Sequence, residues 1–270
     1  MDKKQVLVTE LLECLNDIEI YEGDTVYTTG NVSRLARSKV KKGDILDALL
    51  TSFELKLGES GTIFAPSASM NLCNTDVVFD IEKTPSHEMG AFSEYLRSTK
   101  YSVRSFHPFW SICGLGHKAD MLKNVSRHSY GVGSPWSNFI KLDAKQVNIG
   151  VHPSKAVTLI HHLEVITGVP YRYTKEFIHP VRRGNKISNE PFYMSVMYLE
   201  SDIKKRIALN EHYFEVMVKK NMLKETIHEP TKMKIWSFKM QDFYEVALDN
   251  FISDIYNYLE YPPDVRPYSK

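Results

Sequence analysis

Hydrophobic and polar positions follow two different periods along the first part of the chain. Apolar residues that recur every three or four positions predict amphipathic helices, here in residues 5–15, 43–58, 87–98 and 156–168. Short apolar runs predict strands, here in residues 24–30, 61–67, 111–116 and 146–151. Helices that alternate with strands favour an α/β fold, in which a central, mostly parallel or mixed sheet carries helices on both faces. The loops beyond the carboxyl ends of its strands are the expected place for a site.

The pattern changes after Tyr171. Two further apolar runs, residues 192–199 and 232–240, predict strands, perhaps antiparallel, and residues 202–223 and 241–259 predict amphipathic helices. The chain contains no linker, repeat or low-complexity segment. We therefore expect a single domain over residues 1–270, with an irregular α+β half at its C-terminus.

Composition and charge exclude several classes of function. Of the 270 residues, 43% are hydrophobic, and 34 Lys and Arg balance 33 Asp and Glu. This even balance gives no support for nucleic-acid binding, and no apolar run approaches the ~20 residues of a membrane span. Three separate cysteines, Cys14, Cys73 and Cys113, predict a reduced, cytoplasmic protein without disulfides. The chain also lacks HExxH and GxSxG, so we predict neither a metal nor a serine nucleophile.

The helix predicted over residues 156–168 carries the first candidate chemistry. His161 and Glu164 lie three positions apart and therefore share a helix face, which His162 does not. The apolar stripe of this helix is predicted to consist of Leu159, Leu163 and Ile166. A carboxylate bonded to one imidazole nitrogen raises the basicity of the other, as general-base catalysis requires. The alternative is a structural hydrogen bond, which is the commoner role of a histidine on a helix.

Two other segments place polar groups beside predicted strands. His107, which precedes a proline, is expected on an extended or turn segment, either in a site or as a capping histidine. Residues 28–44 offer hydroxyls, free backbone donors and cations, which suit phosphates or the amide chain of pantetheine. A solvated basic loop is the alternative, because neither a P-loop nor a GxGxxG spacing is present. Cys113 lies in an apolar run, where a thiol is usually inert.

An ordered series of segments resembles the aminoglycoside 3-N-acetyltransferase family. The segments span roughly residues 20–180 and read GDTVYTTG, ILDALL, GESGTIFAPS, EMGAFSEYLR, VRSFHPFWSICGLG, GVGSPWSNFIKLDAKQVNIGV and TLIHHLEVITGVPYRY. The resemblance implies an N-acyltransferase that passes an acyl group from acetyl-CoA or another acyl-CoA to the amine of an amino sugar, without a covalent acyl-enzyme. It also implies an acyl-CoA-binding core in residues 1–180 and an acceptor-side extension in residues 181–270.

The resemblance further implies roles for individual residues. The family's HxxE helix maps onto His161 as general base and Glu164 as its orienting partner, and the RSxHPxxS segment places His107 near the thioester, as a possible oxyanion donor. The contacts expected with acyl-CoA are Thr28, Thr29, Gly30, Asn31, Val32, Ser33, Arg34, Arg37, Ser105 and Ser111. The contacts expected with the acceptor are Tyr171, Arg172, Ser67 and Ser69.

Charge decides which acceptor we expect. The near-neutral balance and the clusters of Lys and Arg suit an anionic acceptor better than a polycationic drug, so we favour a dTDP- or UDP-linked amino sugar over an aminoglycoside. Two rival classes are an amide hydrolase that uses the same His-Glu pair on water, and a binding module that kept the fold. We expect small-molecule partners, no nucleic acid, no membrane, and a monomer or a homodimer.

Overall fold

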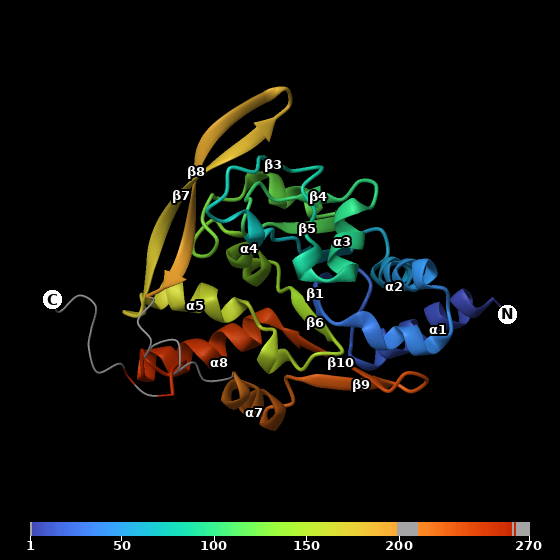
Figure 1. The fold of residues 1–270 in the computed structure, drawn as a ribbon. Helices are drawn as coiled ribbons and strands as arrows, with labels where there is room; N and C mark the ends of the chain where they lie inside the picture. Colours follow the sequence, from blue (N-terminus) through green and yellow to red (C-terminus); the bar gives the residue numbers. More distant parts are fainter. Residues whose placement is uncertain (1, 199–209, 261, 263–270) are drawn as a thin grey trace.

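The computed structural model describes residues 2–198, 210–260 and 262. The helices and strands predicted before Tyr171 are all present, within a few residues of their predicted bounds (Figure 1). They are α1 (Lys3–Asp17), β1 (Thr25–Gly30), α2 (Lys42–Leu57), β2 (Thr62–Pro66), α3 (Ala91–Ser98), β5 (Ile112–Gly116), β6 (Lys145–Ile149) and α5 (Leu159–Thr167). Gly168 ends α5 with a φ of 67°, the left-handed conformation that glycine adopts most easily.

A seven-stranded sheet forms the centre of the fold, in the order β4-β5-β2-β1-β6-β10-β9. The strands not yet named are β4 (Val103–Arg104), β9 (Lys224–His228) and β10 (Met233–Lys239). β1 is parallel to both β2 and β6, and the other neighbouring pairs are antiparallel. The sheet is thus mixed, and the predicted α/β class is confirmed. Because three parallel strands end at one edge, the loops that follow β1, β2 and β6 meet there.

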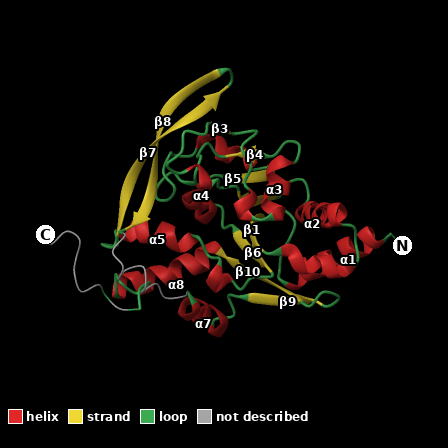
Figure 2. Cartoon of the chain, viewed as in Figure 1, coloured by secondary structure: helices red, strands yellow, loops and turns green. Residues whose placement is uncertain are grey.

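Helices cover both faces of this sheet, as predicted (Figures 1 and 2). One buried apolar cluster lies under α1, α2 and α3, and a second lies under α5, α4 (Pro135–Lys141), α7 (Glu211–Lys219) and α8 (Met240–Ser253). Neighbouring residues of β1 serve the two clusters in turn, since Val26 belongs to the first and Tyr27 to the second. Within the described ranges, no helix is long and apolar enough to cross a membrane.

The C-terminal half departs from the prediction in its helices and in one hairpin. The helix expected over residues 202–223 is represented by α7 alone, and residues 199–209 lie outside the described part of the chain. A long hairpin of β7 (Arg172–Arg183) and β8 (Lys186–Met197) projects from the body of the protein, and β3 (Phe79–Asp80) pairs with it (Figure 1). Most side chains of β7 are exposed or half-buried, so this strand has no apolar run that the sequence could reveal.

Candidate functional site

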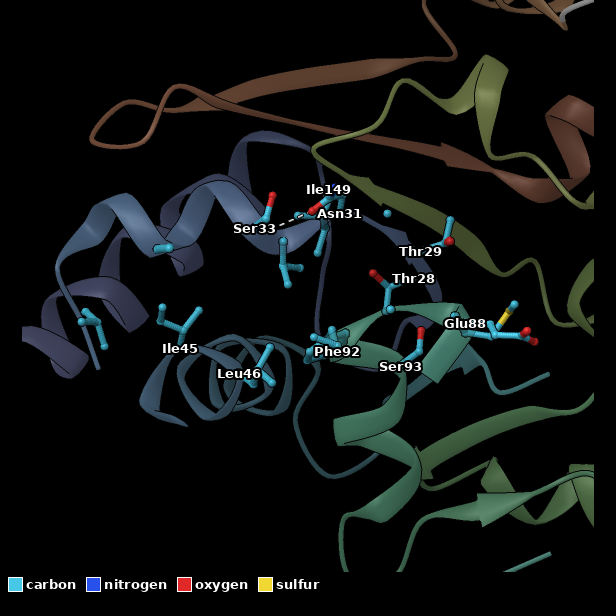
Figure 3. A pocket seen from close by; sticks show the side chains of 17 residues that line it. Thr28, Thr29, Asn31, Ser33, Ile45, Leu46, Glu88, Phe92, Ser93 and Ile149 are labelled. Carbon is cyan, nitrogen blue, oxygen red and sulfur yellow. Dashed lines mark hydrogen bonds between the residues drawn. The ribbon is translucent and has the colours of Figure 1, made fainter. Parts of the chain in front are cut away.

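A pocket of about 620 Å³ opens at the carboxyl end of β1 (Figure 3). One wall is the chain that leaves β1 and enters a 3₁₀ helix, η1 (Val32–Ser38). The other wall comes from α2, from a second 3₁₀ helix, η3 (His87–Met89), and from the start of α3. Six of the residues expected to contact acyl-CoA lie in this pocket: Thr28, Thr29, Gly30, Asn31, Val32 and Ser33.

Local backbone geometry fixes the first wall. Gly30 has a φ of +135°, and a Cβ atom there would lie 2.0 Å from the carbonyl oxygen of Ile149 on β6, so only glycine fits. The next amide, Asn31 N, donates to that same carbonyl at 2.7 Å. The Asn31 side chain then accepts from Ser33 N at 2.9 Å and caps η1. The loop is therefore held against β6 and turned into the pocket wall.

The pocket combines apolar walls with few polar groups. Ile45, Leu46 and Phe92 supply apolar surface, and the buried hydroxyl of Thr28 has no hydrogen-bond partner among the described residues. A narrow apolar channel with an unused hydroxyl suits a chain of methylenes and amides. The second wall also contributes Glu88 and other residues of segment 88–93, which sequence reasoning missed because nothing local to that helix marks it as part of a site.

Four of the expected acyl-CoA contacts, Arg34, Arg37, Ser105 and Ser111, lie outside this pocket. Arg34 and Arg37 follow on η1, but neither side chain is part of the pocket wall. The guanidinium of Arg34 donates from Nη1 to the backbone oxygen of Lys232, at 3.0 Å. The basic residues after β1 are therefore on its outer side and could reach only the parts of a ligand that leave the pocket.

His161, Glu164 and Arg172 form a compact polar cluster at the join between α5 and β7. His161 Nδ1 lies 2.6 Å from Glu164 Oε2, as the shared helix face predicts. Arg172 Nε lies 2.6 Å from the same oxygen, as an ion pair whose N–H is not aimed for a hydrogen bond. Arg172 Nη2 also lies 3.1 Å from Nδ1, but a guanidinium only donates and a carboxylate only accepts, so Nδ1 can hydrogen-bond to only one of the two. We assign the Nδ1 proton to the shorter contact, that with Glu164, which leaves the lone pair on Nε2.

The surroundings of the cluster keep Glu164 charged and the neighbouring phenols neutral. Although burial opposes ionisation, the bonds and charges of His161 and Arg172 lower the pKa of Glu164. The rings of Tyr130 and Tyr258 pack edge-on against the His161 imidazole, with centroids 5.6 and 6.0 Å away. Burial raises the pKa of Tyr130 well above its usual range and that of Tyr258 to about 12.

His162 is a packing residue, as its position beside the apolar stripe indicated. Its side chain is buried, Nδ1 accepts from Gly131 N at 3.1 Å, and burial lowers the pKa of the imidazole to about 4. The predicted stripe needs one correction, because Ile166 is 41% exposed. Ile160 takes its place in the buried face, since α5 packs its N-terminal turns, and not its last turn, against the core.

Arg104 bonds three of the four predicted serines, Ser67, Ser69 and Ser111, in a buried network. The guanidinium donates to Ser111 Oγ at 2.9 Å, to Ser69 Oγ at 3.1 Å and to the backbone oxygen of Thr84 at 2.6 Å. The hydroxyl of Ser67 donates to Ser111, and that of Ser105 accepts from the Ile112 amide. All four serines are at most 2% exposed. Their hydroxyls thus bond within the loops after β2 and β4, and the contacts expected from Ser67, Ser69, Ser105 and Ser111 stay predictions.

His107 belongs to the same interior. It is 3% exposed, Nδ1 accepts from Trp110 N at 3.0 Å, and burial lowers the pKa to about 3. Its ring packs against Phe109 and Phe192. The structure thus favours the capping alternative for His107, which does not lie in the pocket wall.

The pocket and the His161 cluster lie on opposite faces of the sheet near one edge. The pocket is on the side of α2 and α3, whereas His161 is on α5. Tyr27, Trp136 and Tyr130 connect the sheet to His161 through ring contacts of 5.2, 6.0 and 5.6 Å between centroids. Since side chains alternate along β1, Thr29 points to the α5 side at the edge.

Comparison with known proteins gives the fold and then the family. The fold is shared with two proteins of known structure, one of them described as an aminoglycoside acetyltransferase. AAC(3)-Xa has a TM-score of 0.76 at 18% identity, over 93% of this chain and 97% of that one. AAC-IIIb, in a binary complex with CoASH, has a TM-score of 0.75 at 18% identity, over 95% and 98%.

The family model described as aminoglycoside 3-N-acetyltransferase matches residues 31–251, most of the chain. The chain therefore belongs to that family, which confirms the family predicted from the ordered segments. Aminoglycoside N(3)-acetyltransferase III of Salmonella sp is 30% identical over 99 residues, which is 35% of this chain and 34% of that protein. The aligned stretch thus spans about a third of the length of that relative.

Proposed function

We propose that this protein is an acyl-CoA-dependent N-acyltransferase that acetylates an amine of an aminoglycoside, with His161 as the general base. The observation that carries the proposal is the imidazole of His161, whose Nδ1 is held at 2.6 Å by a buried carboxylate. That arrangement leaves Nε2 as a proton acceptor at the edge of the sheet where the pocket also opens. Membership of the family supplies the reaction class.

Acyl-CoA would bind with its pantetheine arm in the pocket at the end of β1. The apolar walls suit the methylene groups, and the unused hydroxyl of Thr28 offers one hydrogen bond to an amide. The solved relative with bound CoASH, which shares the fold, supports CoA as the cosubstrate. The thioester end would then extend past Thr29 toward the α5 side of the sheet.

The chemical step is a direct transfer. The acceptor amine attacks the thioester carbonyl carbon, and His161 Nε2 takes the proton that the nitrogen loses as the C–N bond forms. The C–S bond then breaks, and the CoA thiolate leaves and takes up the proton that His161 Nε2 received from the amine. Glu164 keeps the Nδ1 proton in place throughout, so the imidazole returns to the same tautomer after each turnover.

The acceptor we propose differs from the nucleotide-linked amino sugar that charge favoured. The curated relative of Salmonella sp is an aminoglycoside N(3)-acetyltransferase, and so is the family by its description. In addition, Arg172, the residue expected to pair with an acceptor phosphate, faces Glu164 within the protein. Overall net charge is a weaker guide than the family, because it reports the whole surface and not the site.

A thiol-release assay tests the proposal. Acetyl-CoA is supplied with an aminoglycoside, with a UDP-linked amino sugar, and with no acceptor. We expect release of free CoA that depends on the aminoglycoside, with the acetylated product detected by mass spectrometry. Release with the nucleotide-linked sugar alone would overturn the acceptor, and cleavage of an amide without CoA would indicate the hydrolase alternative.

A further inference from the structure

Glu164 Oε2 is shared by two cationic or proton-donating groups. His161 Nδ1 and Arg172 Nε each lie 2.6 Å from it, and Arg172 Nη2 lies 3.1 Å from His161 Nδ1. The Glu164 side chain is 0% exposed and that of Arg172 is 11% exposed. The pair expected from the sequence is therefore a cluster of three residues, in which the arginine touches both others.

We propose that Arg172 is a positioning residue for the acyl transfer: its guanidinium keeps Glu164 ionised and balances the carboxylate charge beside His161, so that the carboxylate holds the Nδ1 proton and Nε2 is left to accept one. This inference rests on the proposed role of His161 as general base. It replaces the expectation that Arg172 binds the acceptor.

Burial of Glu164 gives the first argument. A buried carboxylate without a cationic partner takes up a proton, because the charged form loses its solvation. A protonated Glu164 would donate its own proton to His161 Nδ1, and the imidazole proton would then reside on Nε2. That tautomer cannot accept a proton from an amine. Arg172, whose Nε is 2.6 Å from the carboxylate, prevents this outcome.

The balance of charge around the imidazole gives the second argument. The groups that face it are Glu164 on α5, Arg172 on β7, and the phenols of Tyr130 and Tyr258. Both phenols are neutral below their raised pKa values. The charges of Glu164 and Arg172 therefore cancel, and a proton on His161 would leave the cluster positive. Without Arg172, the same proton would neutralise the cluster and would be taken up more readily.

The backbone holds Arg172 in this place. The short connection after Gly168 turns the chain from α5 directly into β7, so that the first residue of the strand faces the helix it has just left. Arg172 pairs in register with Met197 of β8, and its Nη1 approaches the Ser195 oxygen at 3.3 Å. The guanidinium is thus committed to protein groups on more than one side.

The dependence of kcat/KM on pH distinguishes this role from a structural one. Arg172→Gln should move the acid limb of the profile up by about one pH unit or more, as expected for loss of a charge within 4–6 Å. Activity should be lost most near neutral pH and recover on the alkaline side. A merely structural loss would lower kcat/KM at every pH. Loss confined to KM for the acceptor would instead mean that Arg172 binds it, and either result would overturn the proposal.

The matched control is Arg183→Gln, which removes another β7 arginine that is paired with a glutamate, Glu190, and is 51% exposed. Its profile should coincide with that of the wild type. Glu164→Gln gives the opposite sign, because the Arg172 charge would then face the imidazole unopposed and the acid limb should move down. Glu164→Gln keeps the proposal testable if Arg172→Gln does not fold. An acid limb that does not move in Glu164→Gln would contradict the proposal.

An NMR titration separates this inference from the proposed function. The imidazole signal of His161 is assigned with His161→Gln, and its protonation midpoint is compared in the wild type and Arg172→Gln without any substrate. An upward shift in Arg172→Gln supports the inference even if no acceptor is turned over. An unchanged midpoint overturns it, whatever the assay of acyl transfer shows.

Discussion

Acidification should destabilise the fold above the pH range in which carboxylates titrate, because burial lowers the pKa of several histidines, and that of His107 and His162 to the lowest values. Burial lowers the pKa of His107 to about 3 and that of His162 to about 4, from an ordinary value of 6.5. In the unfolded chain both imidazoles bind a proton once the pH falls below their ordinary pKa. In the native state neither imidazole binds a proton until the pH reaches its lowered pKa. The unfolded state therefore binds more protons in this window, and stability falls as the pH falls.

The magnitude follows from the proton count. Each group contributes a slope of about 1.4 kcal/mol per pH unit, so the two together give about 2.7 kcal/mol per unit. From about pH 6.5 to about pH 4.5 the loss amounts to roughly 5 kcal/mol, which is a large share of the 5–15 kcal/mol typical of a folded domain. Glu164, whose pKa is lowered, stabilises the fold above about 4.5 and adds its own loss only below that value.

Urea unfolding followed by tryptophan fluorescence, at several pH values from neutral to about pH 4.5, measures how steeply the free energy of unfolding falls with pH. His162→Asn is the matched variant, because the Asn amide oxygen can accept the Gly131 N–H in place of Nδ1. It should reduce the slope by about 1.4 kcal/mol per pH unit, the share of one histidine. A wild-type free energy of unfolding that stays constant over this window would refute the reasoning, as would a slope that His162→Asn leaves unchanged.

Three further changes test other parts of the structure. Gly30→Ala places a Cβ 2.0 Å from a backbone oxygen, at a φ of +135°. It should abolish CoA binding in calorimetry and lower the melting temperature. The control, Gly184→Ala in the open hairpin turn, should leave CoA binding unchanged. Arg104→Met removes the donor to the buried Thr84 oxygen and should cost about 1–3 kcal/mol in urea unfolding; wild-type stability would contradict the network. Native protein should show one reactive thiol with a disulfide reagent, that of half-buried Cys73. Cys14 and Cys113 should not react, because both are buried and their pKa values are raised to about 12. A second thiol that reacts fast would contradict the burial of Cys14 and Cys113.

Local signals in the sequence predicted the elements and pairs that depend on local geometry. The parallel strands are apolar runs because they are buried on both faces, and the contact between His161 and Glu164 follows from helical spacing alone. The wall of the pocket formed by residues 28–33 follows a predicted strand for the same reason.

Features that depend on distant segments could not be predicted in this way. The other wall, residues 88–93, reaches the pocket only through the packing of α3. The hydroxyls of Ser69 and Ser111 resemble ligand contacts in the sequence, but both accept from Arg104, which lies on another strand. The sequence did not reveal the partner of Arg172, because the turn between α5 and β7 brings Glu164 to it.

The central claim is that His161, and not its neighbour, is the base of an acyl-CoA-dependent transfer. The most direct test compares kcat for CoA release from acetyl-CoA with an aminoglycoside in His161→Gln and His162→Asn, with CoA affinity measured in both. We predict that His161→Gln lowers kcat by about 10²–10⁴-fold with CoA affinity unchanged, and that His162→Asn has a far smaller effect. A kcat near that of the wild type in His161→Gln would contradict the account.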